Sequence, residues 1–352
     1  MKKIIDLRSD TVTLPTREMM EAMTNAELGD DVFGEDKTTA RLQECAAGLL
    51  GKEAAMLVTS GTMGNLTAIL THTQSRRPEI IAEYKSHIMV SEGGGYAHFG
   101  SVAARPIEGR HGALDPGKVE ECVRDRDNVH YPVTSLICIE NTHNQAGGTA
   151  IPLDNIYAVK KVADKYKIPM HLDGARIFNA AIALGVDAKA VAAPFDSVQF
   201  CLSKGLSAPV GSILTGSAEF IKEARHIRKM LGGGMRQCGI IAAAGLVALT
   251  KMTARLAEDH ENAKALAAGL VQMPGIDIDM FTVQTNIVRT GVEGTGMEAP
   301  AFAARLAEEG VLCGAQGKYV IRFVLNRHVT AADVQTALGS ISKIITAFRA
   351  GR

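Results

Sequence analysis

Short apolar runs recur along the first two thirds of the chain, separated by stretches in which apolar residues return every three or four positions. The runs are typical of buried strands, and the stretches between them are typical of amphipathic helices. One such helix follows Asp154 and ends before Ile168-Pro169, because a residue that precedes proline disfavours helical backbone. The predicted strands are 55–59, 87–90, 135–140, 169–173, 197–202 and 211–216.

The pattern changes near residue 240. Residues 239–271 are rich in Ala and Leu, with charges only from Lys251 onward, which predicts one long helix leaving the core. Short strands follow, and a closing helix starts at Thr330, where Asp333 completes a capping-box pattern. Alternating strands and helices favour an α/β fold with a largely parallel sheet between helices. We therefore predict an N-terminal arm (1–12), a large α/β domain (13–248) and a small α+β domain (249–352).

Composition and charge narrow the classes of function. The 352 residues are 46% hydrophobic, and 38 basic residues balance 38 acidic ones, so electrostatics gives no case for nucleic acid or an anionic membrane. The longest apolar run, 240–249, is too short to span a bilayer, and the first residues lack the apolar segment of a signal peptide. The six cysteines form no CxxC pair, which predicts free thiols in a cytoplasmic protein.

Lys204 stands in "CLSKGLSAPVGSIL", between runs that are typical of buried strands. A buried ammonium is costly unless it is paired or neutralised, and proteins tolerate that cost mainly where an amine acts as a nucleophile. The ordinary alternative is a lysine at a strand end, with its stem packed and its charged head in water.

Two further motifs follow predicted strands. In "HLDGAR", Asp173 ends an apolar strand, where open α/β sheets bind ligands; it would either cap a helix or keep a cofactor nitrogen protonated. "TSGTMGNLTAIL" puts small and hydroxyl residues at a helix start, which suits a phosphate or a plain N-cap. His171 beside Asp173 suggests a metal, but no third ligand lies nearby in the sequence and no HExxH occurs, so we expect no metal site.

Basic residues and histidines supply the remaining candidates. "LGGGMRQ" with Lys229 and Arg236 is either an anion contact or a flexible loop, and Arg322 among valines is either an edge-strand charge or a carboxylate clamp. His87 and His130 have strand-like surroundings that are typical of structural histidines. Taken together, a phosphate cradle, a strand-end aspartate, a flanked lysine and carboxylate-binding arginines are what pyridoxal phosphate requires.

The chain resembles the low-specificity L-threonine aldolases of the aminotransferase-like (fold-type I) pyridoxal-phosphate family, which also holds the β-eliminating lyases. The resemblance runs nearly from end to end, and it implies a homodimer or homotetramer with active sites at the subunit interface. The motifs that carry it are "IDLRSDTVTLPT", "GDDVFGED", "SGTMGN", "IENTHN", "HLDGARIFNA", "CLSKGLSAPVGS", "RKMLGGGMRQ" and "EDHENA".

The resemblance assigns roles around the cofactor pyridoxal 5′-phosphate. Lys204 would form the Schiff base, Asp173 would bind the pyridine nitrogen, and His87 would stack on the ring. The other residues that it places at the cofactor are Gly61, Thr62, Arg176, Lys229 and Arg236, the last two reaching a neighbouring subunit's cofactor.

For the substrate, the resemblance implies that Ser9, Arg176 and Arg322 surround the carboxylate and that His130 lies near the β-hydroxyl. The implied activity is cleavage of L-threonine, L-allo-threonine and related β-hydroxy-α-amino acids to glycine and an aldehyde. His87, His130 or a water would be the base. Two alternatives stay open: a lyase of the same fold that eliminates across Cα–Cβ, and a pyridoxal-phosphate fold used as a binding module.

Two positions depart from the resembled motifs. Phe33 stands where tyrosine is usual in GDDVYGED, and Ser207 stands where glycine is usual in GLGAP. These changes bear on the preference for the substrate side chain and leave the lysine, aspartate and arginine positions intact.

Overall fold

The computed structural model describes residues 3–351 and divides into two compact units. The sheet unit comprises Leu14–Gln145 and Ala150–Thr253. The C-terminal unit comprises Ala146–Thr149, the described residues from Ala254 onward, and the described residues before Leu14.

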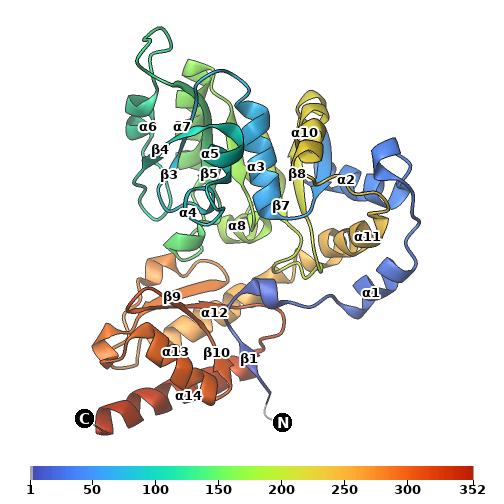
Figure 1. Ribbon diagram of the computed structural model, residues 1–352. Helices are drawn as coiled ribbons and strands as arrows, with labels where there is room; N and C mark the ends of the chain where they lie inside the picture. Colours follow the sequence, from blue (N-terminus) through green and yellow to red (C-terminus); the bar gives the residue numbers. More distant parts are fainter. Residues whose placement is uncertain (1–2, 352) are drawn as a thin grey trace. The chain divides into compact units, whose positions relative to one another are not determined.

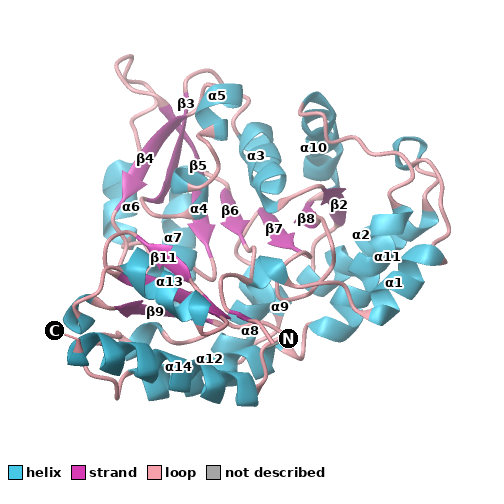
Figure 2. Cartoon of the chain, turned by 60° about the horizontal axis from the view of Figure 1, so that its bottom comes forward, coloured by secondary structure: helices cyan, strands magenta, loops and turns pink. Residues whose placement is uncertain are grey.

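A seven-stranded sheet forms the centre of the sheet unit, and helices flank it (Figures 1 and 2). Its order is β2-β8-β7-β6-β5-β3-β4, and the pairs are parallel except where β8 meets β2 and β7. This confirms the predicted α/β class with a mostly parallel sheet. The strands are β2 (Ala54–Val58), β3 (Pro78–Glu83), β4 (Ala103–Ile107), β5 (Val133–Glu140), β6 (Met170–Asp173), β7 (Ser197–Cys201) and β8 (Ser212–Gly216).

In the sheet unit, one predicted strand is wrong and two observed strands, β3 and β4, were missed. Residues 87–90 form a short helix, because a four-residue apolar run has no periodicity that separates strand from helix. β3 was missed because its apolar run is bounded by two glutamates, whose side chains are buried in the fold. β4 was missed because it contains proline, which an edge strand tolerates.

Helices of the sheet unit start and end at recognisable signals. The Ser60 hydroxyl caps α3 by accepting a hydrogen bond from the Met63 amide, and α7 ends at Lys167 in the left-handed region before the predicted Ile168-Pro169 stop. The helices are α1 (Arg17–Thr24), α2 (Lys37–Leu50), α3 (Gly61–His72), α4 (His87–Val90), α5 (Gly95–Gly100), α6 (Pro116–Cys122), α7 (Leu153–Tyr166), α8 (Ile177–Leu184), α9 (Ala188–Ala192), α10 (Ala218–Met230) and α11 (Gly239–Val247), with the 3-10 turn η2 (Asp31–Phe33).

The long helix predicted over 239–271 is broken. α11 continues into a π-helical segment, η4 (Ala248–Met252), and α12 (Leu256–Leu270) begins after a short turn, where the two units divide. The Thr250 hydroxyl donates to the carbonyl oxygen of Leu246 four residues earlier, a bond that bends helices. Within residues 3–351, no single helix is long and apolar enough to cross a membrane. The bent pair formed by Gly239–Met252 and Leu256–Leu270 reaches the necessary length and hydropathy only when its two parts are taken together.

The C-terminal unit has its own hydrophobic core, which α12 and the closing helix α14 share with a three-stranded antiparallel sheet, β11-β12-β9. A two-stranded parallel sheet joins β1 to β10. Thr330 and Asp333 form the predicted capping box, and Val334 is buried as predicted. The elements are β1 (Ile5–Asp6), η1 (Asp10–Val12), β9 (Ile287–Gly291), α13 (Ala299–Glu308), β10 (Val311–Leu312), β11 (Gly314–Gln316), β12 (Val320–Val324) and α14 (Ala331–Ala350).

Candidate active site

Acidic side chains gather where the parallel strands of the large sheet end. Asp173 ends β6 and Glu140 ends β5, and the two residues pair in register. Lys204 follows the end of β7, which runs parallel to β6. Because parallel strands end at the same edge, the chain brings Lys204 and Asp173 to the edge where open α/β sheets bind ligands.

Asp173 is 1% exposed, and its carboxylate is held by uncharged donors. Oδ2 accepts a hydrogen bond from the Asn65 side-chain amide at 2.9 Å, and Oδ1 accepts from the Ala175 backbone amide at 3.1 Å. The Gln199 amide donates to Oδ1 at 3.0 Å in the orientation that satisfies both of its atoms. Asp173 does not cap α8, whose N-cap position is Arg176. A buried carboxylate is therefore presented without a cation among its hydrogen-bond donors in the described chain, which suits a positively charged ligand nitrogen.

The start of α3 approaches β7 closely. A Cβ on Gly61 would lie 2.8 Å from the Cys201 sulfur, and one on Gly64 would lie 2.5 Å from Cγ of Gln199, so both positions require glycine. The Ser60 hydroxyl already serves the Met63 amide, which leaves the first-turn amides of Gly61 and Thr62 without a partner in the described residues. Unpaired amides at a helix start bind phosphate well.

His87 begins α4 rather than lying in a strand, and two carboxylates fix it. Its backbone amide donates to Glu140 at 2.5 Å, and its ring Nδ1 bonds Glu92 at 2.7 Å. The hydrogen bond to Glu92 raises the pKa of His87 above its ordinary value, and burial raises the pKa of the Glu92 carboxyl.

The ligand atoms of His87, Glu92 and Asp173 lie within 4.8 Å of one another, a spacing that a cation can bridge. The Asn65 amide, however, donates to both carboxylates, at 2.8 Å to Glu92 and 2.9 Å to Asp173. A hydrogen-bond donor therefore already bridges the two acids, and the donor set favours a hydrogen-bonded cluster over a metal site.

Lys204 lies in the loop between β7 and β8 and is half-buried. Its carbonyl oxygen accepts from the Ser207 amide at 2.8 Å. Ser207 has φ 65, in the left-handed region that favours glycine, which accounts for the usual glycine of the resembled motif. Its buried hydroxyl has no hydrogen-bond partner in the described residues.

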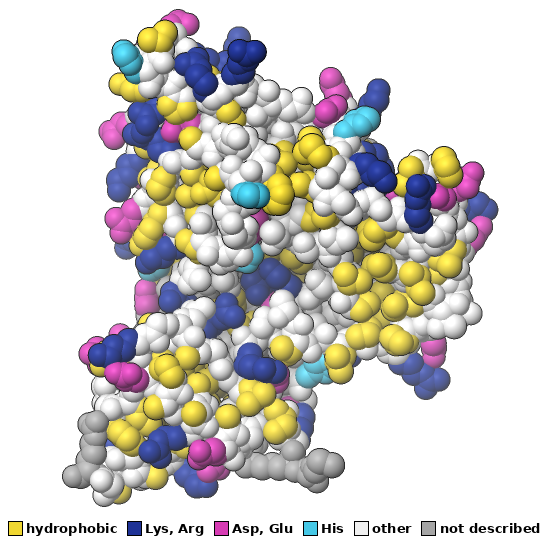
Figure 3. Space-filling model, in the orientation of Figure 1, with side chains coloured by type: hydrophobic (Ala, Val, Ile, Leu, Met, Phe, Trp, Pro, Cys, Tyr) yellow, Lys and Arg dark blue, Asp and Glu magenta, His cyan; other side chains and the backbone are white. Residues whose placement is uncertain are grey.

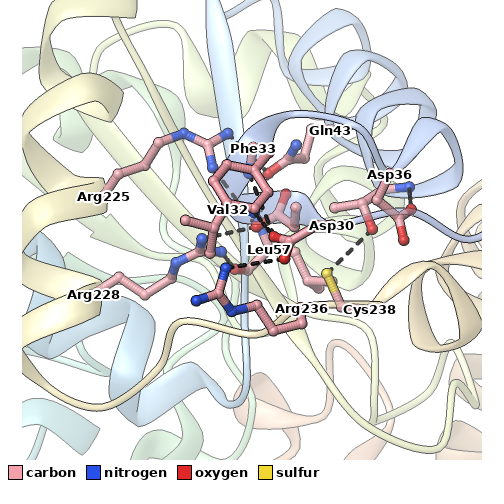
Figure 4. Close-up of polar contacts among 12 residues, drawn as sticks. Asp30, Val32, Phe33, Asp36, Gln43, Leu57, Arg225, Arg228, Arg236 and Cys238 are labelled. Atoms are coloured by element: carbon pink, nitrogen blue, oxygen red, sulfur yellow. Dashed lines mark hydrogen bonds and ion pairs between the residues drawn. The ribbon is translucent and has the colours of Figure 1, made fainter.

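The "GDDVFGED" loop packs against the basic loop that follows α10 (Figure 4). Arg236 donates to Asp30 at 2.9 Å, and buried Arg228 donates to Asp31 at 2.9 Å. Asp36 accepts from the Gly239 amide at 2.9 Å. Three aspartates of this motif thus bind the end of α10, the loop that follows it and the first amide of α11.

A cavity of about 560 Å³ lies beside this contact, lined by Phe33, Arg225 and Lys229 among others. Lys229 and Arg236 are both exposed, and the Phe33 side chain is 74% exposed. The two predicted basic residues thus share one surface of the sheet unit with an exposed aromatic ring.

His130 lies away from this cluster within the sheet unit, and two further predicted residues belong to the other unit. His130 lies in the loop before β5, whose eight residues separate it from the Asp173 edge by about 25 Å along the strand direction. Ser9 and Arg322 belong to the C-terminal unit, where Ser9 caps η1 and the Arg322 guanidinium donates to the Arg8 carbonyl oxygen at 3.3 Å.

The comparisons with known proteins agree with the geometry. The family described as "Beta-eliminating lyase" matches residues 6–292. The chain belongs to the beta-eliminating lyase family. It is 44% identical to the "Probable low-specificity L-threonine aldolase 2" of Arabidopsis thaliana, with 97% of each chain covered. It is 43% identical to the "Low specificity L-threonine aldolase" of Escherichia coli K12, covering 86% of this chain and 89% of the other.

Solved structures share the fold of this beta-eliminating lyase family member. The chain superposes on the threonine aldolase of Leishmania major with a TM-score of 0.82 at 18% identity, covering 97% of this chain and 99% of the other. At that identity the likeness carries the fold alone, and it confirms the predicted fold class with a large sheet domain and a smaller α+β domain.

Sequence reasoning missed three residues of the site: Asn65, Glu92 and Glu140. Asn65 is the last residue of the quoted "SGTMGN" motif and Glu140 is the second of "IENTHN", but neither motif says which side chain points at which partner. Glu92 lies two residues beyond the predicted strand 87–90, and its contact with the His87 ring could not be foreseen because that segment is the helix α4.

Proposed function

We propose that the chain is a pyridoxal-phosphate-dependent lyase that cleaves L-threonine, L-allo-threonine and related β-hydroxy-α-amino acids to glycine and an aldehyde. The observation that carries this proposal is Asp173, a buried carboxylate with only uncharged donors, at the same sheet edge as Lys204. The names of the similar relatives support the substrate class.

The residues present fit the cofactor. Asp173 would bind the pyridine nitrogen, Lys204 would hold the cofactor covalently, and the amides of Gly61 and Thr62 would bind the phosphate. When bound, the cofactor supplies an electron sink for the charge that develops at the substrate Cα. Arg176, buried at the N-cap position of α8, would take an anionic group.

The chain's own residues supply the proton transfer. Glu92 holds Nδ1 of His87, so Nε2 is the ring nitrogen that can take a proton from the β-hydroxyl. The raised pKa makes this imidazole a stronger base than an isolated one. His130 lies at the opposite ends of the strands from Asp173 in the same chain, so a role for it would need a neighbouring subunit.

The assay separates this proposal from the alternative lyase. L-threonine, L-allo-threonine and L-phenylserine should each yield glycine and the corresponding aldehyde. Ammonia and a keto acid would instead identify β-elimination. Borohydride treatment of the holoenzyme should fix the cofactor to a peptide that contains Lys204, and label on a different lysine would overturn that assignment.

We also infer a homodimer as the smallest active form, paired into a homotetramer, in the cytoplasm. Exposed hydrophobic side chains gather over α1 and α11 in Figure 3, where Leu14, Met20 and Ile240 are exposed. A patch of this kind favours association, and the basic loop with Lys229 and Arg236 would reach a neighbour's phosphate. All six cysteines are free, as a reducing compartment would keep them.

Complementation tests the shared site. Lys204→Ala chains and Arg236→Ala chains, each inactive alone, should regain activity when their subunits exchange, because one mixed site then receives both intact groups. An active monomer in light scattering, or no recovery after proven exchange, would contradict the shared site.

A further inference from the structure

A row of buried polar side chains runs from the end of α3 to Asp173. Its members are buried or nearly so and lie between α3 and the strands β6 and β7. In order they are His72, Ser197, His171, Asn65 and Asp173, and each bonds the next.

Secondary-structure periodicity places these groups in a line. Asn65 and His72 are seven residues apart on α3, which puts them on one face of the helix two turns apart. His171 and Asp173 are two residues apart on β6 and therefore point to the same face of the sheet. His171 pairs in register with Ser197 on β7.

The acceptor at one end fixes the direction of every hydrogen bond. An ionised carboxylate can only accept, so the Nδ2 side of Asn65 must face Asp173. Its Oδ1 then accepts from Nε2 of His171 at 3.1 Å, which requires a hydrogen on that nitrogen.

The ring of His171 fixes the direction of the remaining hydrogen bonds, as far as His72. Burial lowers the pKa of His171 to about 3, so the ring is neutral and its Nδ1 is an acceptor. The Ser197 hydroxyl therefore donates to Nδ1 at 2.8 Å, and its oxygen accepts from Nε2 of His72 at 2.8 Å. All the donors point towards Asp173.

From this arrangement we propose that Asn65 is a positioning residue, which holds Asp173 and the Glu92–His87 pair together at the end of a row of hydrogen bonds that all donate towards Asp173. Its two amide hydrogens serve both carboxylates, which would otherwise repel each other. Aligned hydrogen bonds strengthen one another and favour the ionised form of the final acceptor. The inference rests on the proposed function only for the roles of Asp173 and His87.

Hydrogen positions give the direct test. Neutron diffraction from holoenzyme crystals in D2O should show deuterium on Nε2 of both His72 and His171, and none on Nδ1 of His171. Deuterium on both nitrogens of His171, or on Nδ1 alone, would refute the proposed direction of these hydrogen bonds. This measurement needs no turnover and is therefore independent of activity. If the predicted hydrogens are found in a protein that fails to cleave L-threonine, the direction of the hydrogen bonds is supported and the proposed function is refuted.

Variants test the consequence for the cofactor. Asn65→Ala should weaken binding of pyridoxal phosphate and lower kcat by about tenfold or more, the scale of one lost charge-assisted hydrogen bond, while the KM for the amino acid changes little. The visible absorption band of the bound cofactor should titrate at a shifted pH. An unchanged spectrum, cofactor affinity and kcat in folded Asn65→Ala would overturn the role.

A matched pair of serines separates this effect from loss of packing. Ser197→Ala breaks the row between His72 and His171, whereas Ser135→Ala removes a buried hydroxyl on β5 that donates to the Val133 carbonyl oxygen and lies outside the row. Only Ser197→Ala should shift the cofactor band. Equal shifts in both variants would contradict the proposal.

Discussion

Asp31 and Asp30 are neighbours in sequence, yet their ion pairs should contribute very differently to stability. Asp31 is buried and accepts from Arg228, which is 4% exposed, at 2.9 Å; Arg225 lies 4.0 Å from the same carboxylate. Asp30 pairs with Arg236, whose side chain is 50% exposed. Substituting Asn for each aspartate removes one charge and keeps the shape.

The Asp31→Asn substitution leaves a buried guanidinium without its counter-charge. Removing one partner of a buried ion pair costs about 3–5 kcal/mol. Arg228 keeps its bond to the Leu57 carbonyl oxygen at 2.7 Å, but its Nε already lacks a partner in the described residues, so little else can compensate. For a unit of this size, the melting temperature falls by about 2–4 °C for each kcal/mol lost from the free energy of unfolding, so it should fall by about 6–20 °C in Asp31→Asn. Asp30→Asn should cost under about 1 kcal/mol, because its pair is largely solvated.

Urea denaturation and thermal melting of the holoenzyme measure both variants. In Asp31→Asn/Arg228→Met the unpaired cation is gone, so the double variant should be more stable than Asp31→Asn alone. Equal losses in Asp30→Asn and Asp31→Asn, or a double variant less stable than Asp31→Asn, would refute the view that this buried pair holds the two loops together.

Three further changes have expected outcomes. Gly64→Ala should destabilise the protein by about 1–3 kcal/mol in urea and weaken cofactor binding, because the new Cβ would lie 2.5 Å from Cγ of Gln199, which holds Asp173; wild-type values for both would contradict the close approach. Glu92→Gln should shift the pH profile of cleavage to lower pH, because the pKa of His87 is raised chiefly by its bond to Glu92; an unmoved profile would remove His87 as the base. Burial lowers the pKa of His72 to about 4, so between pH 6.5 and 4 only the unfolded chain protonates this ring, and the free energy of unfolding falls as the pH drops. His72→Gln should weaken this pH dependence in urea titrations, and an equal slope would argue against the buried neutral ring.

The sequence was most informative for candidate residues that lie where a strand meets the next turn or helix. Asp173, Lys204 and Gly61 each follow an apolar run, and a strand end places a side chain at a definite edge whatever the rest of the fold does. The capping box at Thr330 was likewise readable, because its two partners are three residues apart.

The contacts that assemble the site could not be read from the sequence, because they join distant segments. Asn65 meets Asp173 from 108 positions away, and Arg228 meets Asp31 from 197. Nothing local marks an asparagine inside an amphipathic helix as a bridge between two carboxylates. The helix around His87 was misread for a related reason: four apolar residues are too few to show a period, and the Glu140 carboxylate that accepts its amide is supplied by another strand.

Two buried aspartates of this chain, Asp31 and Asp173, differ in their hydrogen-bond partners. Asp31 has a guanidinium in contact, so its charge is compensated within the chain and its role is structural. Asp173 has only amides as donors, and its charge helps to raise the pKa of nearby Glu92, so the strand-end cluster holds more negative charge than its neighbours compensate. Such a cluster is costly to fold and becomes favourable when a protonated ligand nitrogen enters, so cofactor binding and folding should reinforce each other. An aspartate after a strand is ambiguous in sequence; at Asp173, burial without a cationic partner at the same strand ends as Lys204 favours a ligand-binding role over a purely structural one.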